Sequence, residues 1–355
     1  MRRLLLGTLL VSATLFAGAQ GQSQRADIPL GLDLYMPVPE ENPFTPEKVA
    51  LGKRLFFDPI LSRDRSLACV FCHDPGRAYT DGRAVAIGVF GRPGTRSAPT
   101  LVNRGYGASF FWDGRMPTLE QQVLQPIQDP KEMDMTLDEA LARLKDHRDY
   151  PALFQAAFGV EVSVEGLSRA LAGYLRTILS GDAPVDRYVN GDHGALSEQA
   201  RQGFTIFRGK GNCTACHGGP TFTDERFHNT GVAWRDPSTL QQAQGRPEPS
   251  RGTTSSGQAG AFRDLGRFVV TGKVEEQGAF KTPTLREIPW TAPYMHDGSL
   301  ASLGEVVDLY DRGGNPNPHL DPEIRPLRLS DDEKKSLAAF LFEALSGKLL
   351  DGQLR

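Results

Sequence analysis

The sequence contains only four cysteines in 355 residues, and after its first 20 residues no apolar stretch is long enough to cross a bilayer. Its net charge is -3, and neither sign forms a long run. A charge this small and this dispersed does not indicate binding to nucleic acid or to an anionic membrane surface. We therefore expect a globular protein with no stable membrane anchor and no nucleic-acid partner.

Residues 1–19 have the pattern of a secretory signal peptide. Arg2 and Arg3 precede an apolar stretch over residues 4–17, and the small residues Ala-Gly-Ala follow at 17–19. A membrane anchor is the alternative, but the stretch is short and is interrupted by glycine, serine and threonine. The sequence therefore predicts cleavage of this peptide and a periplasmic or otherwise exported protein.

All four cysteines belong to two Cys-x-x-Cys-His motifs. The motifs consist of Cys69, Cys72 and His73 in the first half of the chain, and of Cys213, Cys216 and His217 in the second half. This spacing allows two thioether bonds to a haem, with the histidine as an axial ligand of its iron. A zinc site built from two Cys-x-x-Cys pairs would need no histidine after either pair. We therefore predict two covalently bound haem c groups, which leave no thiol for a disulfide.

Helical signals dominate the sequence. Helices are expected to begin after the capping residues Thr45, Thr118, Thr136, Ser163, Ser197, Ser302 and Ser330. The first should run to about residue 57, the one after Ser163 carries apolar residues as far as Ile178, and the last should end near Gly347. The best strand signal is 268–271 (FVVT). The expected fold class is mainly α, with little β structure.

One haem motif in each half predicts two domains, with a boundary near residues 181–184. We assign residues 30–180 to an N-terminal haem domain and 181–350 to a C-terminal haem domain. Residues 237–260 are rich in Gln, Ser, Gly and Pro, which is typical of a flexible surface loop inside the second domain.

Four further segments carry a resemblance to a known family. They are residues 51–58 (LGKRLFFD), 111–115 (FWDGR), 281–286 (KTPTLR) and 291–298 (TAPYMHDG). Together with the two haem motifs they resemble the bacterial dihaem cytochrome c peroxidase family, including its MauG-like branch. The resemblance implies two cytochrome-c-like domains packed face to face. It also implies that the N-terminal haem meets peroxide and the C-terminal haem transfers electrons.

By this resemblance, His73 is the proximal ligand of the peroxide-reacting haem. Many family members block the opposite face with a second histidine, but no histidine lies between His73 and His147, and the matching stretch, 86–91, reads AIGVFG. The resemblance assigns proton transfer to Glu132, oxygen binding to Gln122, and the distal proline to Pro126. From the residues alone, a solvated carboxylate in a charged turn is the favoured reading of Glu132, since Glu is mostly exposed.

The resemblance gives Trp112 the role of a bridge between the haems, although packing at a domain interface is a common place for tryptophan. It makes His217 the proximal ligand of the second haem and places Tyr310 where other peroxidases have a methionine ligand. The MauG-like branch has tyrosine there, and a phenolate should lower the haem potential. Met295, the only methionine in the second half, is the rival ligand. An open or water-bound iron, or a core tyrosine, are further alternatives.

The family also carries a calcium ion between its domains. Backbone carbonyls at Thr291 and Pro293 match two of its ligands, and carbonyl oxygen suits calcium. The asparagine that usually adds a side-chain oxygen is replaced by Ser97. We therefore include one calcium ion as a possible second cofactor.

Three functions follow from these residues. The leading hypothesis is a peroxidase that reduces hydrogen peroxide with electrons from a small cytochrome c or a copper protein. The alternative is a MauG-like oxidase that uses peroxide to oxidise a side chain of a partner protein. Tyr310 favours the oxidase, but residues 209–212 (GKGN) lack the tryptophan that this branch has before its second motif. The third, a non-catalytic electron carrier, is disfavoured by Glu132 and Gln122.

Overall fold

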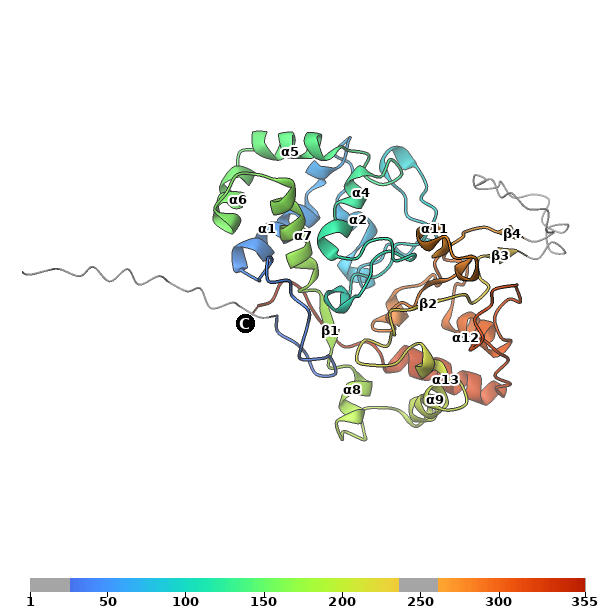
Figure 1. Cartoon of the computed structure of the whole chain (residues 1–355). Helices are drawn as coiled ribbons and strands as arrows, with labels where there is room; N and C mark the ends of the chain where they lie inside the picture. The colour runs from blue at the N-terminus through green and yellow to red at the C-terminus, as the bar shows by residue number, and fades with distance from the viewer. Residues whose placement is uncertain (1–25, 236–260, 355) are drawn as a thin grey trace, which may run out of the picture.

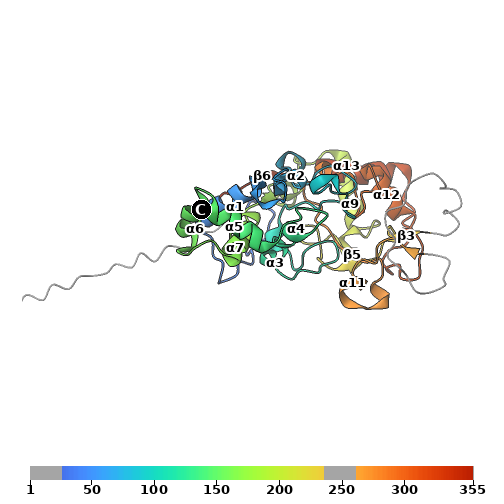
Figure 2. The ribbon, with the colours of Figure 1, turned by 90° about the horizontal axis from the view of Figure 1, so that it is seen from above.

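The computed structural model describes residues 26–235 and 261–354. The predicted signal peptide, residues 1–19, and the predicted 237–260 loop lie outside these ranges. Figures 1 and 2 show two halves of the chain side by side, each with its own group of helices. Buried apolar residues form one cluster in each half. No helix of the described ranges is long and apolar enough to span a membrane.

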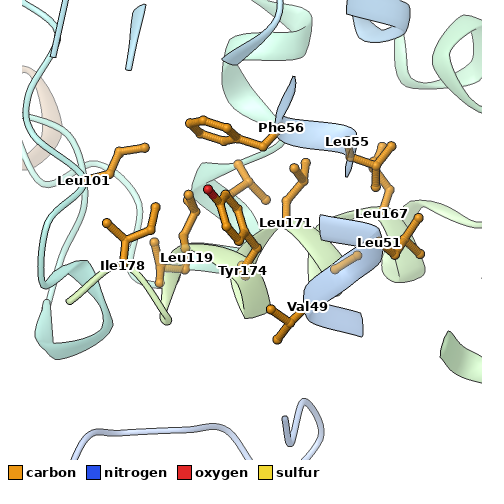
Figure 3. Packing of buried hydrophobic residues seen from close by; sticks show 14 of the residues in the cluster. Val49, Leu51, Leu55, Phe56, Leu101, Leu119, Leu167, Leu171, Tyr174 and Ile178 are labelled. Atoms are coloured by element: carbon orange, nitrogen blue, oxygen red, sulfur yellow. The ribbon is translucent and has the colours of Figure 1, made fainter. Parts of the chain in front are cut away.

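The N-terminal half is built around α1 and α7. Its helices are α1 (Pro46–Phe57), α2 (Cys69–Cys72), α3 (Leu119–Gln122), α4 (Gln125–Gln128), α5 (Leu137–Asp146), α6 (Tyr150–Phe158) and α7 (Val164–Leu175). The apolar faces of α1 and α7 pack together in the core, as Figure 3 shows. A glycine allows this close crossing, because a Cβ at Gly52 would lie 1.9 Å from the carbonyl oxygen of Ala170.

The C-terminal half repeats this arrangement with α9 and α13. Its helices are α8 (Pro184–Val189), α9 (Glu198–Arg208), α11 (Phe268–Thr271), α12 (Leu303–Asp311) and α13 (Asp331–Glu343). A Cβ at Gly203 of α9 would lie 1.9 Å from the carbonyl oxygen of Ser336 in α13. The short 3-10 turns of both halves are Pro59–Leu61, Pro75–Arg77, Val89–Gly91, Arg104–Tyr106, Cys213–Ala215, Val274–Glu276 and Ile288–Trp290.

The strands are short and pair only in twos within the described residues. The antiparallel pairs are β1 (Leu179–Gly181) with β6 (Lys348–Leu350), β2 (Phe227–His228) with β5 (Phe280–Lys281), and β3 (Trp234–Arg235) with β4 (Ala261–Phe262). The mainly α fold class is thereby confirmed. Because β6 pairs with β1, the end of the chain returns to the first half, where Leu350 joins the N-terminal core.

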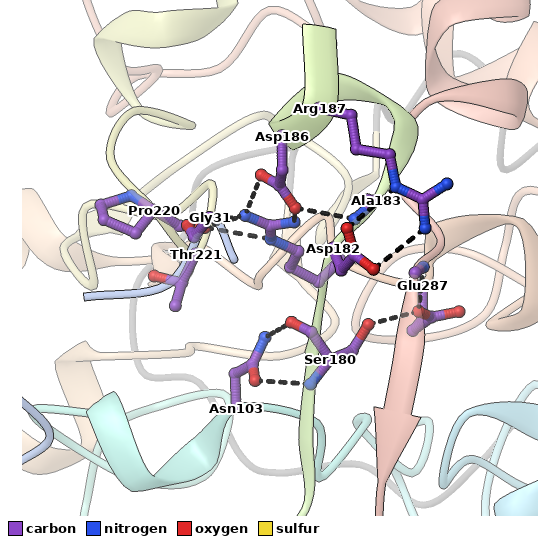
Figure 4. A network of polar contacts seen from close by, with 12 residues as sticks. Gly31, Asn103, Ser180, Asp182, Ala183, Asp186, Arg187, Pro220, Thr221 and Glu287 are labelled. Carbon is purple, nitrogen blue, oxygen red and sulfur yellow. Dashed lines mark hydrogen bonds and ion pairs between the residues drawn. The ribbon is translucent and has the colours of Figure 1, made fainter. Parts of the chain in front are cut away.

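A polar network fixes β1 between the halves, as Figure 4 shows. Ser180 exchanges two hydrogen bonds with the side chain of Asn103, at 2.9 and 3.0 Å, and its hydroxyl donates to Glu287. Close by, the buried guanidinium of Arg286 pairs with both carboxylate oxygens of Asp186. Arg286 also donates to the carbonyl of Gly31, which ties the second half to the N-terminal segment.

The predicted helix starts are confirmed. Capping boxes form at Thr136, Ser302 and Ser330, and Thr45, Ser163 and Ser197 cap their helices by side-chain hydrogen bonds. Thr118 also caps α3, but without the reciprocal bond of a capping box.

Three secondary-structure predictions were wrong. The stretch 268–271 is helix α11, which ends at Gly272 with φ +71°. Val269 and Val270 are exposed, so their β-branched side chains have no neighbouring strand to pack on. Helix α7 ends at Leu175, before Ile178, because the chain turns into β1 there. Helix α13 ends at Glu343, before the turn into β6.

Candidate active site

Both Cys-x-x-Cys-His motifs line one continuous cavity between the halves, with a volume of about 730 Å³. The cavity wall includes every residue singled out as a candidate. They are Cys69, Cys72, His73, Trp112, Gln122, Pro126, Glu132, Cys213, Cys216, His217, Thr291, Pro293, Met295 and Tyr310. The fold therefore brings together candidates that span more than two thirds of the sequence.

The two motif histidines are held in the same way. Nδ1 of His73 lies 3.0 Å from the carbonyl oxygen of Tyr79, and Nδ1 of His217 lies 3.0 Å from that of Phe222. A carbonyl oxygen only accepts, so each Nδ1 carries the hydrogen and each Nε2 is free to bind a metal. Burial lowers the pKa of both imidazoles, that of His217 to about 4, which keeps them neutral.

The four thiols are free and lie on the cavity wall beside these histidines. Cys69 and Cys72 are the ends of α2, and Cys213 opens a 3-10 turn that Cys216 closes. Each half thus presents two thiols and one neutral, oriented imidazole to an apolar cavity. This is the donor set that covalent attachment and axial ligation of a c-type haem require.

The backbone of Glu132 is held on three sides. Its N–H donates to the carbonyl of Asp129 at 2.9 Å, and its carbonyl accepts from the N–H of Val89 at 2.8 Å. Its neighbour Met133 donates to the carbonyl of Pro126 at 3.1 Å. Gly88 packs against the same turn, since a Cβ there would lie 2.0 Å from the carbonyl oxygen of Lys131. The stretch that lacks a histidine therefore supports the turn that carries Glu132.

The carboxyl of Glu132 is half-buried, and no other described residue makes a hydrogen bond to it. Burial raises its pKa to about 7, and the nearby Asp129 carboxylate adds to this rise. Arg115 opposes the rise but does not cancel it. A carboxyl that titrates near neutral pH and faces a cavity can both accept and return a proton.

Gln122 and Pro126 lie on the same wall as Glu132. Gln122 is the last residue of α3, and its side-chain amide is likewise without a hydrogen-bond partner among the described residues. Pro126 occupies the first turn of α4, where its missing N–H costs nothing. The cavity therefore has one amide and one carboxyl, both unpaired, from a short stretch of chain.

Trp112 is anchored to both halves. Its indole Nε1 donates to the carbonyl of Ser97 at 2.9 Å, and its own carbonyl accepts from the N–H of Lys281 at 2.8 Å. Ser97 in turn donates its N–H to the carbonyl of His296 at 2.7 Å. The indole is half-buried on the cavity wall, so its position depends on how the halves are docked.

Tyr310 and Met295 reach the cavity from different elements. Tyr310 lies in the last turn of α12, and its hydroxyl has no hydrogen-bond partner within the described part of the chain. Burial raises the pKa of this phenol, and the thiols of Cys213 and Cys216 nearby raise it further. Met295 belongs to the loop before α12. The described residues thus offer a phenol beside the second motif, and a thioether on the wall of the shared cavity.

The candidate calcium residues lie where the halves meet. Thr291 and Pro293 flank Ala292 on the cavity wall, and the Ala292–Pro293 peptide is cis. The hydroxyl of Thr291 donates to the carbonyl of Ile288 at 3.2 Å. Ser97, at the position of the family's asparagine, is buried nearby through its bond to His296.

Sequence reasoning missed a buried ion cluster on this wall. Arg104 forms a bidentate pair with Glu225, at 2.7 and 3.1 Å, and Lys281 lies 3.4 Å from the same carboxylate. Burial alone would raise the pKa of Glu225, but Arg104 and Lys281 together lower it to about 2. Burial and the neighbouring Arg104 lower the pKa of Lys281 to about 7. The cluster joins the halves, and Arg104 and Lys281 line the cavity.

Sequence reasoning also missed His228. Its Nδ1 lies 2.6 Å from a carboxylate oxygen of Asp321, and its Nε2 lies 3.0 Å from one of Asp224. Asp321, then Cys216 and Asp224, raise the pKa of His228 to about 11. Asp224 is four residues from His228 and could have been noticed in the sequence. Asp321 is 93 residues away, so its pairing with His228 could not.

This fold and this cavity define a two-haem c-type cytochrome. The comparisons with known proteins agree. Residues 46–194 match the family described as di-haem cytochrome c peroxidase. The chain belongs to this family, and it is a haem peroxidase of the MauG-like branch that acts on peroxide and binds two c-type haems.

Three relatives illustrate the likeness. The chain is 41% identical to the methylamine utilization protein MauG of Methylorubrum extorquens, over 86% of this chain and 80% of that protein. It is 38% identical to the cytochrome-c peroxidase IdrP1 of Denitromonas iodatirespirans, over 95% and 92% of the two chains. A solved structure of a MauG-like protein associated with microbial copper homeostasis matches with a TM-score of 0.76 at 33% identity, over 89% and 95%.

Proposed function

We propose that peroxide is reduced at the N-terminal haem, held by Cys69, Cys72 and His73, with electrons supplied through the C-terminal haem at His217. The observation that carries this proposal is the carboxyl of Glu132, which is unpaired, faces the cavity and has a pKa of about 7. A carboxyl of this kind is suited to proton transfer at neutral pH. An electron carrier without catalysis would have no use for it.

Bound haem supplies the electron transfer that cleaves the O–O bond. Glu132 takes the proton from one peroxide oxygen and returns it to the other, so that the second oxygen leaves as water. The amide of Gln122 donates a hydrogen bond that holds the bound oxygen. Pro126 has no N–H, so it offers no competing donor to that oxygen. No histidine between His73 and His147 competes for this face, so we propose that the site is open without prior reduction.

Electrons pass between the two haem sites through Trp112 in this proposal. Its support is the pair of anchors, to Ser97 in one half and to Lys281 in the other, which hold the indole on the shared wall. We propose transfer from the C-terminal site to the N-terminal site. The donor is a small cytochrome c or a copper protein that docks on the C-terminal half.

A second function is favoured by Tyr310. We propose that this tyrosine, rather than Met295, would ligate the iron of the C-terminal haem, because its hydroxyl reaches the cavity without another partner among the described residues. An anionic phenolate lowers the haem potential and stabilises an oxidised centre. Both haems would then share the oxidising equivalents of peroxide, which suits an oxidase that acts on a side chain of a partner protein.

Export and calcium complete the proposal. Haem c attachment outside the cytoplasm fits the signal pattern of residues 1–19, so we propose a periplasmic or otherwise exported protein with two domains, 30–180 and 181–350.

We also propose one calcium ion held by the carbonyls of Thr291 and Pro293. Its test is chelation, which should lower the thermal stability of the holoprotein and be reversed by added calcium alone.

The deciding experiment mixes the diferric holoprotein with one equivalent of hydrogen peroxide and no reductant, and follows the optical and EPR spectra. We expect one high-spin haem before mixing and rapid peroxide consumption. Glu132→Gln should slow that consumption by about 10²–10⁴-fold, the usual contribution of a positioned acid–base group. The exposed Glu161→Gln is the matched control and should not change it. Two low-spin haems that ignore peroxide until one is reduced would contradict the proposal.

A further inference from the structure

Two buried tyrosines are linked to the first haem motif through His73. The carbonyl of Tyr79 accepts the Nδ1–H of His73, so this tyrosine is one hydrogen bond away from the proximal ligand. The hydroxyl of Tyr79 lies 3.5 Å from the hydroxyl of Tyr174, and both side chains are fully buried. Phe56 packs edge-on against both rings, with centroid distances of 6.1 and 5.3 Å.

The pair continues to the surface through Asp351 and Lys53. The Asp351 carboxylate adjoins both tyrosine hydroxyls, and its Oδ1 is buried without a hydrogen-bond partner among the described residues. Its Oδ2 lies 2.9 Å from the ammonium of Lys53, which is partly exposed. That ammonium also lies 6.0 Å from the centre of the Tyr174 ring. A line of contacts therefore runs from His73 to solvent through Tyr79, Tyr174, Asp351 and Lys53, none of which lines the cavity.

We propose that Tyr174, reached through Tyr79, is a one-electron oxidation site that carries oxidising equivalents from the N-terminal haem to the surface at Lys53 and Asp351. This inference rests on the proposed reaction of that haem with peroxide. Oxidising equivalents would leave the N-terminal haem by this route when no donor supplies electrons to the C-terminal haem. A small one-electron reductant at this surface, such as a phenol, would return an electron to the buried Tyr174, and Asp351 would return the proton.

The step balances with peroxide as the oxidant. Tyr174 gives one electron, by way of Tyr79 and His73, to the haem site that peroxide has oxidised. Its phenolic O–H bond breaks, and the proton moves to the buried Oδ1 of Asp351, which leaves a neutral tyrosyl radical. The arrangement suits this transfer because burial and the adjacent hydroxyl and carboxylate raise the pKa of Tyr174, so electron loss requires a nearby proton acceptor. Phe56 offers no removable proton.

The test is freeze-quench EPR of the holoprotein after one equivalent of hydrogen peroxide without reductant. We expect an organic radical whose signal narrows when the protein carries ring-deuterated tyrosine. Tyr174→Phe should reduce its yield at least fivefold, and Asp351→Asn, which keeps both tyrosines, should slow its appearance. Tyr150→Phe is the matched control, because Tyr150 is buried in the same half and bonded to the carboxylate of Asp58, but is not linked to His73.

The outcomes separate this inference from the proposed function. If peroxide is consumed but the radical is unaffected by deuterated tyrosine, persists in Tyr174→Phe, or is lost in Tyr150→Phe, the relay is wrong and the peroxidase proposal stands. If the wild-type protein does not react with peroxide at all, both are overturned. Turnover with a donor that feeds the C-terminal haem should be equal in the wild type and Tyr174→Phe.

Discussion

The backbone N–H of Val89 donates a hydrogen bond of 2.8 Å to the carbonyl oxygen of Glu132. These residues are far apart in the sequence, and their contact joins the loop that lacks a histidine to the turn that carries the candidate proton-transfer group. Gly88 makes the contact possible, because its missing Cβ leaves room for the carbonyl of Lys131. The same loop thus leaves one cavity face free of a histidine and positions Glu132.

Gly88→Ala should displace that turn. The added Cβ would lie 2.0 Å from the carbonyl oxygen of Lys131 and 2.7 Å from that of Glu132, so the backbone must move. A catalytic group misplaced by about 1 Å can cost about 10²-fold in rate, and we expect a loss of this order in peroxide consumption. Stopped-flow kinetics measures it. Gly173→Ala, whose Cβ would meet no atom within 4 Å, is the control and should leave the rate unchanged.

The peroxide reaction should speed up as pH rises through about 7. The pKa of Glu132 is raised to about 7, mainly by burial, and only the carboxylate form can accept the proton. Glu132→Gln should flatten this pH profile, and a profile unchanged in that variant would disprove the assignment. The same pKa shift affects folding stability in the opposite direction: as pH rises, the reaction rate increases but the stability decreases. A carboxyl with a raised folded-state pKa contributes stability below its ordinary pKa, and this is lost as pH rises through 7.

Glu225→Gln should destabilise the protein by about 3–5 kcal/mol at pH 7, because it leaves the buried guanidinium of Arg104 without its carboxylate. The pKa of Glu225 is lowered to about 2, so its contribution is present above its ordinary pKa of 4.5 and is lost as pH falls toward 2. Denaturant unfolding from pH 7 to 3.5 should show the two proteins converging.

An exposed pair is the matched control for this prediction. Glu198 pairs with Arg201 on the surface of α9, with exposed side chains on both sides. Glu198→Gln should not change the unfolding midpoint measurably, since exposed ion pairs contribute little. Equal losses in the two variants would mean that the cluster at Glu225 has no special role between the halves.

Tyr310→Phe should change the spectrum of the C-terminal haem, because it removes the oxygen that we propose as axial ligand. The potential of that haem should rise once the anionic ligand is lost. Met295→Leu is the paired variant and should leave the spectrum and the potential unchanged. Spectroelectrochemistry of both variants decides between the ligands, and the reverse pattern would assign Met295.

Local chemistry was readable from the sequence. The two haem motifs need only five consecutive residues each, and helix caps need three or four, so both were predicted correctly. The family resemblance supplied Glu132, Gln122, Trp112 and Tyr310, and the structure places all four on one cavity wall. Their chemical roles stay predictions. The segment 268–271 failed because β propensity is local, whereas a strand also needs a neighbour that only the fold provides.

Only the tertiary structure decided which residues that are distant in the sequence make contact. Tyr79 and Tyr174 are separated by 95 positions, Arg104 and Glu225 by 121, and His228 and Asp321 by 93. Burial then sets their chemistry, since the same side chains in water would keep ordinary pKa values. The sequence by itself determined which groups could carry haem and peroxide chemistry. The docking of the two halves decided which of them meet, because desolvation and pairing exist only once the chain has folded.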